Sequence, residues 1–182
     1  MKKEQIEEAI TNAQKGIGQY LDIMEEFHSV DVSSSREFQK KYNAFYRVQR
    51  RTAEWYETYY GFMEQSKNTP VTFAETLDYL NTHLGRYEPS FSSKLAATVN
   101  PFVPIWDEHI LNNTGISSPA YQSASKVEDA KDAYVLIEQW YIEFLKSDVG
   151  RLCVNTFNEK IFRYYEMTDL KKVDFILWQT RA

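Results

Sequence analysis

A lysine and an aspartate near the middle of the chain are the residues whose types and spacing point most directly to chemistry. Lys94 lies in the apolar run 91–99, and Asp107 follows 13 residues later, after Pro104-Ile105-Trp106. A nucleophilic lysine needs its pKa lowered from about 10.4, and desolvation at the end of an apolar helix can do that. A carboxylate at a helix start stays ionised. The structural alternative is that Asp107 is a helix N-cap and Lys94 an exposed first-turn lysine.

The region 84–116 resembles the active-site segment of helix-hairpin-helix DNA glycosylases. In that family a lysine opens an apolar helix and Asp-x-His-[Ile/Val] begins the next helix, which here reads Asp107-Glu108-His109-Ile110. The resemblance covers about 30 of the 182 residues. It implies a DNA glycosylase or lyase that acts on damaged bases or abasic sites. Lys94 would then form a Schiff base with the sugar, and Asp107 would be the essential catalytic carboxylate.

The segment departs from the family pattern in two places. The family grips a DNA phosphate with the amides of two hairpin glycines, whereas here only Gly85 is present and Pro89 intrudes. The 13 residues between Lys94 and Asp107 are also fewer than the family usually shows. The segment therefore lacks the glycine pair with which the family anchors phosphate, and its intervening helix is about one turn shorter.

A basic cluster precedes this region. We predict one long helix from about Arg36 to Gln65, on which Lys40, Arg47 and Arg51 share a face by heptad spacing. With interleaved Tyr42, Tyr46 and Trp55, such a face could contact phosphates and stack bases of duplex DNA. The alternative is a solvated face that is paired with Glu37, Glu54 and Glu57.

Metal, thiol and nucleotide chemistry have weaker signals. Glu25-x-x-His28 is half of a di-iron motif, but Leu80 and Trp106 stand three positions before the other two histidines. Cys153 lies between Leu152 and Val154, which is typical of a small buried hydrophobe. No phosphate-binding glycine loop is present. We therefore expect no metal and no cofactor.

Apolar spacing of three and four residues recurs through the chain, and no segment shows sustained strand-like alternation. The sequence thus predicts an all-α fold, a single compact bundle-like domain over 1–182 with about seven or eight helices. The expected helices cover about 3–28, 36–65, 73–84, 91–99, 106–112, 127–145, 149–165 and 168–179. Thr72 is expected to cap the third of these helices and Gly85 to stop it.

Composition limits the compartment and the partners. A net charge of -5 means that any nucleic-acid contact must use a local patch. The single cysteine, the charged start of the chain and the short apolar runs lead us to expect a soluble cytoplasmic protein without a membrane partner. The 4 Trp, 13 Tyr and 11 Phe leave a second function open. This second function is that of a non-catalytic helical protein, which binds a partner or self-associates as a homo-oligomer through its aromatic side chains.

Overall fold

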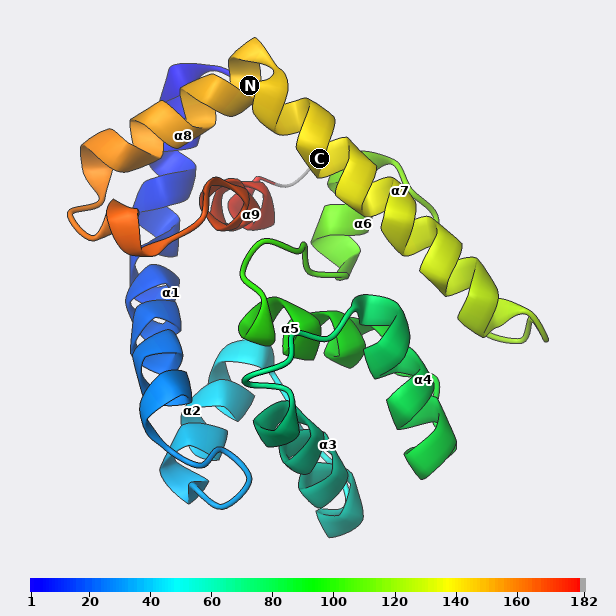
Figure 1. Ribbon diagram of the computed structural model, residues 1–182. Coiled ribbons are helices and arrows are strands. Elements are labelled where there is room, and N and C mark those ends of the chain that lie inside the picture. Colours follow the sequence, from blue (N-terminus) through cyan, green and yellow to red (C-terminus); the bar gives the residue numbers. More distant parts are fainter. Residues whose placement is uncertain (181–182) are drawn as a thin grey trace. The chain divides into compact units, whose positions relative to one another are not determined.

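The computed structural model describes residues 1–180, and this part of the chain is all-α, as the sequence predicted (Figure 1). Within it, regular structure consists of nine α-helices and one short 3-10 helix, with no strand. In chain order these are α1 (Lys3–Ser29), α2 (Arg36–Tyr46), α3 (Ala53–Gln65), α4 (Phe73–Leu84), α5 (Pro89–Val99), α6 (Glu108–Thr114), α7 (Lys126–Lys146), α8 (Asp148–Lys160), η1 (Tyr164–Glu166) and α9 (Asp169–Gln179).

The chain divides into two compact units. Unit 1 consists of Met1–Gln14 and Pro101–Ala182, of which residues up to 180 are described, and unit 2 consists of Lys15–Asn100. The division falls within α1 and again just after α5. The single domain that we expect over 1–182 stays a prediction.

Aromatic side chains fill unit 2. Tyr42 of α2 and Tyr59 of α3 are fully buried, and their hydroxyl oxygens lie 2.9 Å apart. The Tyr59 hydroxyl also donates to the backbone carbonyl of Phe91 in α5 at 3.0 Å. Because buried hydroxyls need hydrogen-bond partners, this chain of contacts fixes α2, α3 and α5 relative to one another.

The predicted long helix from Arg36 to Gln65 is wrong, because the chain leaves helical geometry between α2 and α3. Arg47 adopts the left-handed region with φ 55° and ends α2, and its amide donates to the carbonyl of Asn43. Arg50 has φ 57°, and the Thr52 hydroxyl accepts from the Trp55 amide to start α3. Val48, between them, is only 3% exposed, so an apolar anchor holds this loop against the core.

The expected start and stop of α4 are confirmed. The Thr72 hydroxyl accepts from the Glu75 amide at 3.2 Å, and the Glu75 carboxylate accepts from the Thr72 amide at 2.8 Å. This reciprocal pair satisfies two amides that the first turn leaves without helical partners. At the other end Gly85 has φ 60°, which a residue without Cβ adopts at little cost.

Unit 1 packs α9 against α6, α7 and α8 (Figure 1). Two side-chain hydrogen bonds hold the loop that leads into α6. The Tyr134 hydroxyl of α7 donates to the carbonyl of Pro104 at 2.6 Å, and the Thr168 hydroxyl donates to the carbonyl of Pro101 at 2.7 Å. Both bonds are made to carbonyls of residues that lie outside any helix, so the proline-rich connector is fixed by the helices of its own unit.

A sharp corner joins α7 to α8. The Ser147 amide donates to the carbonyl of Phe144, and the Ser147 hydroxyl accepts from the Gly150 amide at 3.0 Å, so one serine both ends α7 and caps α8. A Cβ added at Gly150 would lie 1.9 Å from the Phe144 carbonyl oxygen. Only glycine fits this corner without movement of the backbone.

Helix α8 ends earlier than the sequence predicted. We expected it to run from about Val149 to Tyr165, but α8 ends at Lys160 and Ile161 is extended. The short helix η1 follows, where the Arg163 guanidinium donates two hydrogen bonds to Glu166, at 2.6 and 2.5 Å. A local ion pair therefore stabilises a loop where apolar spacing alone would continue the helix.

Candidate functional site

Lys94 lies in the middle of α5, whereas the sequence pattern placed it at the start of a helix. Its ammonium donates to the backbone carbonyl of Tyr46 at 3.4 Å. It also lies over two aromatic rings, 5.1 Å from the centre of Phe91 and 5.9 Å from the centre of Tyr46. The alternative of an exposed first-turn lysine is wrong, because the side chain is half-buried and is held against α2 by these contacts.

Asp107 is the N-cap of α6, as the structural alternative predicted. Its Oδ1 accepts from the amides of His109 and Ile110, at 2.9 and 3.2 Å. Its Oδ2 accepts from the indole Nε1 of Trp178 at 2.5 Å. Both carboxylate oxygens are therefore engaged by groups of unit 1, two at the start of α6 and one at the end of α9.

The two candidate catalytic residues belong to different units. Lys94 lies in unit 2 and Asp107 in unit 1, and each is held by residues of its own unit. Their contacts describe a lysine that packs α5 on α2 and an aspartate that ties α9 to α6.

The three predicted nucleic-acid-binding residues do not share one helix face. Lys40 lies on α2, Arg47 ends that helix, and both are exposed. Arg51 lies in the following loop, where its guanidinium pairs with the buried Glu88 at 3.1 Å. The heptad argument fails because Arg47 leaves helical geometry, so the face defined by helical spacing does not form. Arg51 thus forms its ion pair with Glu88, and not with Glu54 or Glu57, which the alternative had named.

The structure does bring Arg51 and Lys94 together. Both cations lie over the ring of Phe91, at 4.8 Å and 5.1 Å from its centre. Glu88 also accepts from Arg86 at 3.0 Å, so one buried carboxylate holds two arginines. This cluster can contribute packing and charge balance to unit 2, because each cation is attracted to the face of the Phe91 ring and Glu88 balances the charge of the arginines.

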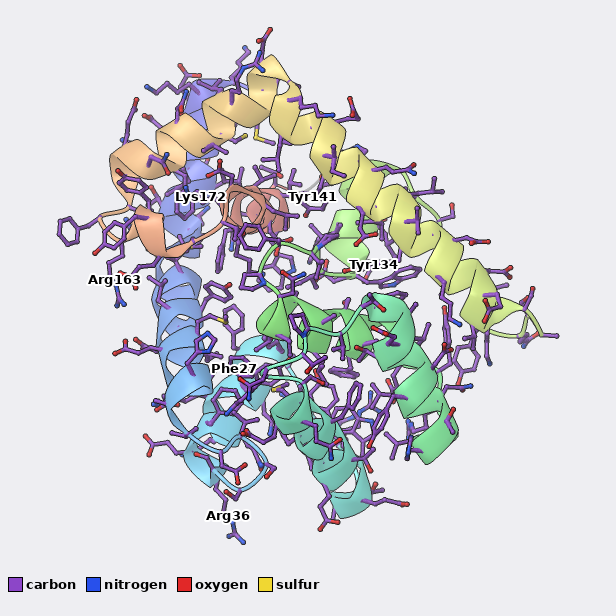
Figure 2. All side chains as sticks on the ribbon, viewed as in Figure 1. Phe27, Arg36, Tyr134, Tyr141, Arg163 and Lys172 are labelled. Carbon is purple, nitrogen blue, oxygen red and sulfur yellow. The ribbon has the colours of Figure 1, made fainter. Side chains whose placement is uncertain are left out.

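Sequence reasoning missed a buried charged group on α9. Lys171 is 4% exposed and Asp174 is 6% exposed, and their side chains pair at 2.7 Å. The Tyr141 hydroxyl donates to the other oxygen of Asp174 at 2.9 Å. Tyr134 and Tyr141 point to the same, buried side of α7 (Figure 2). In the sequence, a lysine and an aspartate three positions apart on a helix indicate a surface ion pair, so the sequence alone gave no sign that this pair is buried.

Burial governs the acid-base behaviour of the inner hydroxyls and the thiol. Burial raises the pKa of Tyr141 well above its usual value of 10.0, and the nearby Asp174 charge adds to this effect. Burial likewise raises the pKa of Tyr42 and Tyr59. The Cys153 thiol is buried and its pKa is raised to about 11. Because the thiolate is the reactive form, Cys153 fits the small buried hydrophobe that the sequence predicted.

Residues 1–180 contain neither a cluster of metal-binding side chains nor a helix suited to a membrane. Among residues 1–180, no three His, Cys, Asp or Glu side chains gather closely enough to hold a metal ion. In the same range, no helix combines the length and the apolar character needed to cross a bilayer.

Exposed apolar side chains are distributed unevenly between the two units. All ten large hydrophobic side chains that are exposed among the described residues belong to unit 1. They are Met1, Phe102, Tyr121, Val135, Leu136, Ile142, Phe162, Tyr164, Tyr165 and Trp178. Phe162 is 89% exposed and Tyr165 68%, in the loop around Arg163 (Figure 2). We call residues 161–165 the aromatic loop.

A large exposed aromatic ring is costly in water unless something covers it, and protein interfaces are enriched in such rings. Unit 1 therefore leaves large apolar side chains exposed, whereas unit 2 shelters its own. Comparison with known proteins gives no relative to set beside this geometry: the sequence matches no family model and no curated protein, and the fold matches no solved structure.

Proposed function

We propose that this protein is a non-catalytic helical protein that binds another protein, and that unit 1 carries the binding surface. The observation that supports this proposal most directly is the confinement of all ten exposed large hydrophobic side chains to unit 1. Interface energy is concentrated in a few aromatic and arginine side chains, which suits the aromatic loop with Arg163 among its rings.

The contacts of the two candidate catalytic residues support a structural role for each. The Asp107 carboxylate already accepts three hydrogen bonds, two on Oδ1 and one on Oδ2, as expected of a group that joins α6 to α9. An amine that donates to a carbonyl and lies over two rings is a packing element of α5. The DNA glycosylase or lyase function therefore stays the second candidate, supported by the sequence resemblance and by the meeting of Arg51 and Lys94 at Phe91.

Site-specific photo-crosslinking tests the proposed function. A photoreactive phenylalanine analogue replaces Phe162 in one variant and the exposed Glu57 of unit 2 in a matched control, and both are expressed in the cells that make the protein. We expect a covalent protein adduct at position 162 and none at position 57. The mass of the adduct then distinguishes a second copy of this chain from a different protein.

The absence of any protein adduct at position 162, together with its absence at Phe102 and Leu136, would contradict the proposal, because these positions sample the exposed apolar surface of unit 1 at three separate points. An adduct of equal yield at the control position would also count against it, since collision with abundant proteins would then explain the crosslinks.

A further inference from the structure

One face of α7 is exposed and apolar at its centre. Val135, Leu136 and Ile142 are 48%, 52% and 53% exposed. With 3.6 residues per turn, these three side chains surround the exposed Gln139 on a single side of the helix. The opposite side carries the buried residues Ala130, Ala133, Tyr134, Ile137 and Tyr141, which pack within unit 1. We call the exposed side the outer face of α7 (yellow in Figure 1).

The outer face carries opposite charges at its two ends. Glu128 and Asp132 are exposed near the start of α7, and Lys146 is exposed at its last residue. Lys146 pairs with Glu143 at 2.9 Å, but the two side chains are 66% and 74% exposed, so water competes with this contact. The helix dipole has the opposite sense, because its positive end lies beside the acidic residues and its negative end beside the lysine, and it therefore stabilises these charges at the ends where they lie.

This pattern is complementary to itself when a second helix runs in the opposite direction. Asp132 and Lys146 each lie seven residues from Gln139, on the two sides of it. A two-fold axis through Gln139 therefore places each Asp132 opposite the Lys146 of the other copy. The same axis places Leu136 opposite Ile142, since each is three residues from Gln139. A parallel pairing would instead set Asp132 against Asp132 and Lys146 against Lys146.

We propose that the outer face of α7 is a self-association surface, on which α7 of a second copy of this chain packs antiparallel about Gln139. This inference rests on the proposed function and names its partner. An isologous contact of this kind needs only one patch on each chain, and charges at its rim fix its direction. Because a single helix from each copy supplies the contact, the dimer is reversible, and the fraction of the protein that is dimeric rises with concentration.

Sedimentation equilibrium of the full chain over a range of concentrations tests the pairing. Wild type is expected to shift from monomer to dimer as concentration rises. Leu136→Glu is expected to remain monomeric, because it buries a charge at the centre of the contact. Ala44→Glu is the matched control, since it also introduces a glutamate at an exposed helix position but lies on α2 of unit 2, and it should dimerise like wild type.

Charge reversal tests the direction of the two helices. Asp132→Lys alone and Lys146→Asp alone are each expected to weaken dimerisation about tenfold, because each creates two like-charge contacts across the axis. The double variant is expected to restore the wild-type dissociation constant. Circular dichroism of each variant checks that the helix content is unchanged, which is expected because all the altered side chains are exposed.

A monomer at all concentrations would overturn the proposal, as would a dimer that Leu136→Glu does not weaken. A double variant that stays as weak as the single variants would overturn the antiparallel pairing. Failure here is separable from failure of the proposed function. A monomeric protein that still forms adducts with a different protein at position 162 retains the proposed function with another partner, whereas the loss of both results contradicts both inferences.

Discussion

The indole nitrogen of Trp178 donates a hydrogen bond to Oδ2 of Asp107, while Oδ1 of the same carboxylate caps the first turn of α6. These residues are 71 positions apart in the chain, so one aspartate joins the end of α9 to the start of α6. The carboxylate that the sequence pattern offered as a catalytic group is thereby occupied on both oxygens.

Replacement of Asp107 tests this structural role. Asp107→Ala removes the cap of α6 and the acceptor of Trp178, so we expect it to lower the free energy of unfolding by about 1–3 kcal/mol. Urea unfolding followed by circular dichroism measures the change. Glu108→Ala is the matched control, because Glu108 is the exposed next residue, and it should change stability by less than about 0.5 kcal/mol. Equal effects of the two substitutions would argue against the capping role.

Borohydride trapping on DNA separates the two candidate functions. The proposed function predicts that no covalent adduct with duplexes carrying an abasic site or a damaged base depends on Lys94, because that amine packs α5 on α2. Wild type and Lys94→Ala should therefore give the same result. An adduct that wild type forms and Lys94→Ala loses would instead establish lyase chemistry at this residue and displace the proposed function.

Alkaline pH should destabilise the protein through its buried tyrosines. Burial raises the pKa of Tyr42, Tyr59, Tyr134 and Tyr141 above the value of 10.0 that each has when exposed. Each of them therefore contributes its full stability below pH 10.0, where the hydroxyl is protonated in both states. As the pH rises further, the unfolded chain loses these protons first, and the free energy of unfolding falls.

Urea unfolding at a series of pH values around and above 10.0 measures this loss. Tyr141→Phe removes one of the titrating hydroxyls and should give a shallower decline above that pH. It should also cost stability at neutral pH, because Asp174 then loses a hydrogen-bond donor. A decline as steep as that of wild type would mean that Tyr141 is accessible to water.

The corner between α7 and α8 should tolerate no side chain at its glycine. In Gly150→Ala the added Cβ would meet the Phe144 carbonyl oxygen at 1.9 Å, so the backbone must shift. We expect a loss of about 1–3 kcal/mol in the free energy of unfolding. Gly18→Ala is the control within α1, where nothing lies within 4 Å of the added Cβ. Its higher helix propensity should stabilise the protein by about 0.5–1 kcal/mol. Urea unfolding should therefore show that the same substitution lowers the free energy of unfolding at position 150 and raises it at position 18.

Features that depend on neighbouring residues could be predicted from the sequence. The cap of α4 at Thr72, the stop at Gly85 and the cap at Asp107 each involve partners within a few positions, so the sequence contains both halves of the interaction. The all-α class follows in the same way, because helical periodicity is a property of consecutive residues. The buried state of Cys153 was also predictable from its apolar neighbours.

Tertiary structure decided what distant residues do. The break after α2 has no glycine or proline to mark it, and Arg47 adopts a left-handed conformation because burial of Val48 outweighs the local strain. In the sequence, Lys171 and Asp174 indicate a surface ion pair. In the structure they are buried, and Tyr141, 33 residues before Asp174, donates a hydrogen bond that offsets the loss of water around the carboxylate. The sequence by itself determined the all-α class and the caps at Thr72, Gly85 and Asp107. The fold alone determined which charged groups are buried and which apolar side chains are left exposed, because both depend on contacts between residues that are far apart in the chain.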